Sequence, residues 1–61
     1  MTLDEALERW AVYEPGALDP AFDLMPGWWK VANDDGIVAY FVDGPSAYRH
    51  RLAMINRELN P

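Results

Sequence analysis

The 61-residue sequence has no cysteine and a single histidine, His50. Without cysteine, disulfide frameworks, thiol nucleophiles and cysteine-ligated zinc sites are excluded. The longest unbroken apolar run, residues 37–42, has six residues, whereas a membrane span needs about twenty. The start of the chain has neither the positive region nor the apolar stretch of a signal peptide. We therefore expect a cytoplasmic protein with no membrane partner, in the host cytoplasm if a phage encodes it.

Positive charge is also scarce. Five Lys and Arg stand against ten Asp and Glu, which gives a net charge of −5. Direct binding of DNA or RNA depends on clustered positive charge, so we do not expect it here. Residues 1–27 hold six of the acids and a single arginine, so the acidity belongs to the N-terminal half.

The composition favours one small folded domain over residues 1–61. The chain is 51% hydrophobic and contains three Trp, three Tyr and two Phe. That apolar content is too high for intrinsic disorder, and each buried ring removes roughly 150–250 Å² from water. We expect the chain to fold without a metal or a cofactor.

The N-terminal residues predict a helix over residues 2–13. Thr2 and Glu5 have the spacing of a capping box, in which each side chain accepts the backbone N–H of the other residue. Pro15 and Gly16 end the helical pattern. The apolar positions recur at helical spacing and predict a single buried stripe: Leu3, Leu7, Trp10 and Ala11.

Residues 14–27 predict a long loop, because three prolines and two glycines interrupt every period. A short helical turn over residues 20–24, capped by Asp19, is one possibility within it. Loops of this length in compact domains are usually packed down by their own side chains. The side chains available for this packing are apolar: Leu18, Phe22, Leu24 and Met25.

Residues 28–42 predict a β-hairpin, since two aromatic and β-branched runs flank a polar turn. We expect a three-residue loop, 34–36, with Gly36 in a left-handed conformation and Asn33 opposite Ile37. A two-residue turn is the alternative and would regroup the strands. The three-residue loop puts an uncharged set on the core face: Trp29, Val31, Ile37, Ala39 and Phe41.

Residues 45–59 predict a second helix, with Pro45 in its first turn. Its apolar seam is expected at Tyr48, Leu52, Ile55 and Leu59. The predicted fold class is therefore α+β: a helix, a long loop, an antiparallel hairpin and a helix. The sheet has two strands, or three if the long loop pairs with the hairpin.

No constellation of residues predicts catalysis or metal binding. His50 lies between two arginines, and Ser46 is at a helix start, so neither resembles a catalytic pair. The turn at 33–36 lacks the acids that a calcium loop needs. We predict a protein that is not an enzyme and has no catalytic residue and no metal ligand.

Two surfaces are candidates for binding a partner. One is the other face of the hairpin, where Lys30 lies between Trp28 and Tyr40; the alternative is that the long loop buries this face through Phe22, Leu24 and Met25. The second surface is a cluster of N-terminal acids that can attract a basic partner. The predicted partner-binding residues come from both surfaces: Glu5, Glu8, Glu14, Asp19, Asp23, Trp28, Lys30 and Tyr40.

The function predicted from these features is that of a non-enzymatic acidic binding module. A small acidic protein can present carboxylates where the phosphates of a nucleic acid would lie. Its expected partner is therefore a protein with a basic, nucleic-acid-handling site. In size and charge alone, with no shared motif, the chain resembles small phage inhibitors of the anti-CRISPR or anti-restriction type. The alternative is a small bacterial accessory or structural protein, a homodimer through Trp28 and Tyr40.

Overall fold

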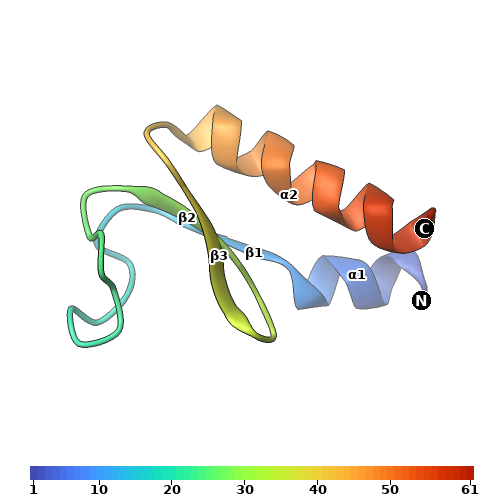
Figure 1. Ribbon diagram of the computed structural model, residues 1–61, viewed down its shortest axis with the longest axis horizontal. Coiled ribbons are helices and arrows are strands. Elements are labelled where there is room, and N and C mark those ends of the chain that lie inside the picture. Colours follow the sequence, from blue (N-terminus) through green and yellow to red (C-terminus); the bar gives the residue numbers. More distant parts are fainter.

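The computed structural model describes all 61 residues and shows an α+β fold, as predicted. The elements follow the order α1 (Leu3–Arg9), β1 (Ala11–Tyr13), β2 (Trp29–Asn33), β3 (Gly36–Phe41) and α2 (Gly44–Leu59) (Figure 1). The strands form one antiparallel sheet in the order β1-β2-β3. Helix α2 packs across all three strands, and α1 lies beside its C-terminal half.

Helix α1 begins as predicted but ends earlier. Thr2 Oγ1 accepts the Glu5 N–H at 3.2 Å, and Glu5 Oε1 accepts the Thr2 N–H at 3.1 Å, so the capping box is confirmed. The helix stops at Arg9, and the prediction of a helix to residue 13 was wrong. The predicted burial of Leu3 and Leu7 was also wrong, because both side chains face solvent.

The third strand comes from residues that the sequence analysis assigned to that helix. Ala11–Tyr13 pairs with Ala32, Val31 and Lys30 of β2. Val12 and Tyr13 are β-branched and aromatic, and such residues suit a half-buried sheet surface. The pairing with β2 outweighs the local helical period, and Trp10, the residue before the strand, is buried as predicted.

The hairpin is confirmed, but its turn differs from the prediction. Asn33 pairs with Gly36 rather than Ile37, so the three-residue loop was wrong and the structure has the alternative two-residue turn, Asp34 and Asp35. A bulge between Val31 and Ala32 then shifts the register. Beyond it, the observed pairs are those that the predicted register implies: Val31 with Ala39, Lys30 with Tyr40 and Trp29 with Phe41.

Helix α2 begins at Gly44, one residue before the predicted start. Asp43 caps it by accepting the Ser46 N–H at 2.7 Å. A β-carbon added at Gly44 would lie 3.1 Å from the Trp29 ring, so this close contact favours glycine. The predicted seam was wrong at two positions, since Tyr48 and Leu52 are exposed.

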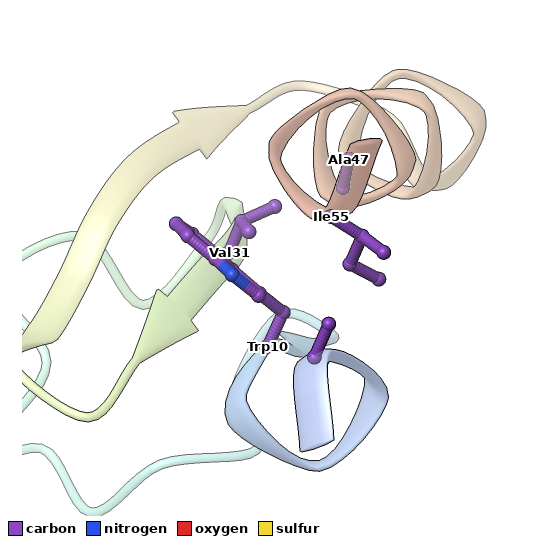
Figure 2. Packing of buried hydrophobic residues seen from close by; sticks show 5 residues of the cluster. Trp10, Val31, Ala47 and Ile55 are labelled. Carbon is purple, nitrogen blue, oxygen red and sulfur yellow. The ribbon is translucent and has the colours of Figure 1, made fainter. Parts of the chain in front are cut away.

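The core is small and lies between α1, α2 and β2. Its five buried residues are Ala6, Trp10, Val31, Ala47 and Ile55 (Figure 2). Only nine of the 61 residues are buried in all. The Trp10 side chain reaches from the end of α1 toward Val31, into the space between the helices and the sheet (Figure 2).

The segment between β1 and β2 has no helix or strand, in agreement with the predicted loop. Hydrogen bonds order it: Gly16 N–H donates to the Pro26 carbonyl at 2.8 Å, and Phe22 N–H donates to the Asp19 carbonyl at 2.8 Å. The Asp19 carboxylate accepts the Ala21 N–H at 2.8 Å, which makes a turn in place of the possible short helix.

Candidate functional site

A buried ion pair joins the long loop to the middle of the sheet. Lys30 Nζ lies 2.7 Å from Asp23 Oδ2, and both side chains have no exposed surface. Apart from this contact, neither atom has a hydrogen-bond partner. The Asp23 carboxylate also accepts the Met25 N–H through its other oxygen at 3.1 Å. The carboxylate therefore holds both the strand and the backbone of the loop.

The ion pair changes the expected aromatic surface. Lys30 is buried and does not lie in the open between Trp28 and Tyr40, so the expectation of an exposed cation on this face was wrong. The loop covers the face, but through Asp23 and not through Phe22 and Leu24. Trp28 is 38% exposed and Tyr40 is half-buried, so a smaller aromatic surface remains.

The residues on either side of Asp23 point outward. Phe22 is 77% exposed and Leu24 is 89% exposed, which contradicts their predicted role in packing the loop. Large exposed apolar side chains on an ordered loop are typical of interaction surfaces. The sequence analysis missed this surface because it treated every apolar residue of the loop as core.

The predicted acids do not form one patch. Glu5 and Glu8 lie on α1, whereas Glu14 and Asp19 lie in the loop at the opposite end of the molecule (Figure 1). The molecule is 33 Å long, so the two groups form separate acidic ends. All four residues are exposed, whereas the fifth predicted acid, Asp23, is buried.

Three of the five basic side chains form salt bridges or hydrogen bonds with other elements of the same chain. Arg9 contacts Glu58 at 2.8 Å and Asp34 at 3.5 Å. Arg51 donates to the carbonyls of Leu7 at 3.0 Å and Trp10 at 2.9 Å, where α1 ends. The third is the buried Lys30.

Consequently, several exposed carboxylates have no basic partner. Asp4, Glu8, Glu14, Asp19 and Asp35 take part in no salt bridge. The backbone and side-chain hydrogen bonds of Thr2 keep the pKa of Glu5 below its ordinary value of 4.5. Its carboxylate therefore stays charged to lower pH than that of an ordinary glutamate.

The chemistry of the remaining polar residues is limited. The surface has no pocket, and no group of three acids or histidines is arranged to hold a metal ion. The single histidine, His50, packs against Phe41, and the centroids of the two rings are 5.1 Å apart. Ser46 lies in the first turn of α2, where its N–H donates to Asp43. No helix is long and apolar enough to cross a membrane.

Comparison of the chain with known proteins gives no match to a protein family, to a curated protein or to a solved structure. The function of the chain is therefore inferred from its fold and from the chemistry of its surface.

Proposed function

We propose that the protein is a non-enzymatic acidic binding module that occupies a basic, nucleic-acid-handling site on a partner protein and inhibits it, in the manner of small phage inhibitors of CRISPR or restriction systems. The observation that carries this proposal is the internal use of Arg9, Lys30 and Arg51. With these three bases engaged, the exposed bases Arg49 and Arg57 both lie on α2, and the carboxylates Glu8, Glu14 and Asp19 have no basic partner. Unpaired surface charge steers association with a partner of opposite sign.

The amount of charge limits what kind of nucleic acid the surface resembles. Over the 33 Å length of the molecule, duplex DNA carries about nineteen phosphates and a single strand about ten. The net charge of the chain is −5. The surface therefore has a charge density nearer to that of a single strand, and charge alone supplies only part of the affinity. Apolar contacts have to supply the rest.

The loop end combines both kinds of contact. Glu14 and Asp19 supply carboxylates, and Phe22 and Leu24 supply exposed apolar side chains on the same loop. Lys30 is the only basic residue that forms a salt bridge with this loop, and its side chain is buried. We assign docking to this end, against an apolar pocket with a basic rim, while Glu5 and Glu8 at the other end contribute to steering.

Two matched variants test this assignment. Glu14→Gln with Asp19→Asn neutralises the loop end and keeps an acceptor for the Ala21 N–H. Glu5→Gln with Glu8→Gln neutralises α1 and keeps an acceptor for the Thr2 N–H. Each pair of changes removes two charges, so any difference between the variants reports the position of the charge.

The experiment is capture of proteins from a cell lysate on the immobilised chain, followed by elution with a single-stranded oligonucleotide. A partner that uses a nucleic-acid site is released by the oligonucleotide, because both ligands compete for the same basic residues. The loop variant should capture much less of this partner than the α1 variant. Capture that resists the oligonucleotide and survives both variants would contradict the proposal.

The alternative function, an accessory protein that dimerises through Trp28 and Tyr40, has no specific feature in its favour. The cation expected between these rings is buried. It stays a prediction, and a Trp28→Ala variant tests it by the molecular mass in solution.

A further inference from the structure

The two helices present apolar side chains on the side that faces away from the sheet. Leu3 and Leu7 of α1 are 54% and 40% exposed, and Tyr48 and Leu52 of α2 are 56% and 58% exposed. We call these four residues the helix-pair face. All four lie on regular helices, so their exposure is a property of the fold.

Helix geometry places the four residues on one side of the pair. Each residue turns a helix by about 100°, so Leu3 and Leu7 lie about 60° and 100° around α1 from the buried Ala6. Tyr48 and Leu52 lie about 20° and 60° around α2 from the buried Ile55 by the same rule. Because α1 and α2 run in opposite directions (Figure 1), equal senses of rotation bring both sets to the same side.

The sheet is on the other side of the helices (Figure 2). The hydrogen bond from Arg51 to the Leu7 carbonyl at 3.0 Å holds the two helices against each other. The helix-pair face is therefore continuous across both helices, with its far edge at Tyr48, whose ring lies 6.4 Å from that of Trp29.

The small core, compared with the apolar area that the helix-pair face exposes, indicates that another molecule covers this face. The core fully buries only three sizeable apolar side chains, Trp10, Val31 and Ile55, alongside two alanines. A domain of this size without disulfides or metal usually needs a denser core or a partner subunit. Exposed apolar patches on ordered elements are the common sites of such association.

The charges on the two helices indicate what the occupant is. Arg9 of α1 and Glu58 of α2 pair with each other, and Arg51 donates to carbonyls at the end of α1. The charges that remain are three acids on α1 and two arginines, Arg49 and Arg57, on α2. A second copy of the chain, related by a twofold axis parallel to the helices, would set each α1 against the α2 of the other copy. Opposite charges then meet across the apolar contact, whereas a twofold axis across the helices would stack like-charged helices.

We propose that the chain forms a homodimer through the helix-pair face, with each α1 packed against the α2 of the second copy and the two sheets on the outside. A standard interface covers about 800 Å² on each partner, roughly a fifth of the 4204 Å² surface of this chain. The proposal goes beyond the proposed function and does not depend on it, because Phe22, Leu24 and the loop acids lie elsewhere.

The test is the molecular mass in solution, measured by sedimentation equilibrium over a concentration series. The wild-type chain should reach twice the monomer mass. Leu7→Glu and Leu52→Lys should each remain monomeric, because each buries a charge against apolar side chains of the second copy. Leu24→Glu is the control, since it changes an exposed leucine outside the face and should leave the dimer intact.

Mixing the two variants tests the arrangement of the dimer. In the proposed dimer, position 7 of one copy meets α2 of the other, so equal amounts of Leu7→Glu and Leu52→Lys should restore the doubled mass. Circular dichroism of each variant checks that the monomer stays folded. A wild-type chain that is monomeric at every concentration would overturn the proposal, as would equal loss of mass in Leu24→Glu. A mixture that stays monomeric while both variants are folded would overturn the crossed arrangement.

Discussion

The ammonium of Lys30 and the carboxylate of Asp23 are 2.7 Å apart, and neither side chain has any exposed surface. The two residues belong to the central strand and to the long loop. Each of the two buried charges has only the other as its ionic partner. If the loop left the sheet, the ion pair would break, and a charge that stayed buried would have no counter-ion. The pair thus holds Phe22 and Leu24 in place on either side of Asp23.

Removing one member of this pair should destabilise the fold strongly. Lys30→Met leaves the Asp23 carboxylate buried without a cation, and we expect the free energy of unfolding to fall by about 3–5 kcal/mol. Urea denaturation measures this loss.

The double variant Lys30→Met with Asp23→Asn is the control, because it removes both charges and keeps an acceptor for the Met25 N–H. It should recover most of the lost stability. If the double variant is as unstable as Lys30→Met, the effect is one of packing and not of an unpaired charge.

Gly36 should not tolerate a side chain. Its φ of +123° lies in a region that L residues rarely adopt, although nothing lies within 4 Å of the place where a β-carbon would be. We expect Gly36→Ala to cost about 1–3 kcal/mol from backbone strain. Gly27→Ala is the matched control, since it has the same open surroundings without a positive φ. Equal melting temperatures for the two variants would contradict the turn.

The helix caps should make stability depend on pH. The hydrogen bonds from Ser46 lower the pKa of Asp43 from 3.8, and those from Thr2 lower the pKa of Glu5 from 4.5. Because the folded pKa is depressed in both cases, the stabilisation is fully present above these ordinary values. It is lost as the pH falls through the lower, folded values.

Thermal melts between neutral and strongly acidic pH measure this loss. The double variant Asp43→Asn with Glu5→Gln should show a smaller fall in melting temperature with acid than the wild type does. Glu8→Gln with Asp19→Asn also removes two acids but leaves both caps in place, so its melting temperature should follow that of the wild type. A cap variant with the wild-type pH dependence would contradict this explanation.

The features that the sequence predicted well depend on neighbours in the chain. The capping box needs only Thr2 and Glu5, and the second helix starts next to Pro45, so both elements were confirmed. The apolar seam of the second helix was wrong at Tyr48 and Leu52. Two strand-like runs on either side of Asp34 and Asp35 predicted the hairpin. The length of the turn was not predicted, because it depends on the bulge between Val31 and Ala32.

The features that the sequence did not predict depend on distant partners. Val12 lies within the predicted helix 2–13 and becomes a strand residue only because the edge of β2 is available. Lys30 is ordinarily a surface residue, and its burial requires Asp23, seven positions away in a loop without periodicity. With Asp23 turned inward, Phe22 and Leu24 turn outward, so the interaction surface could not be predicted from hydrophobicity alone.

The central claim, that the free carboxylates of the loop end bind a basic nucleic-acid site, is tested most directly by the salt dependence of binding to a captured partner. The affinity of the wild type should fall steeply as salt rises, since screening acts over about 8–10 Å at physiological ionic strength. Glu14→Gln with Asp19→Asn should weaken binding and flatten this dependence, and Glu5→Gln with Glu8→Gln should do so much less. Affinity that is independent of salt and equal for all three proteins would contradict the claim.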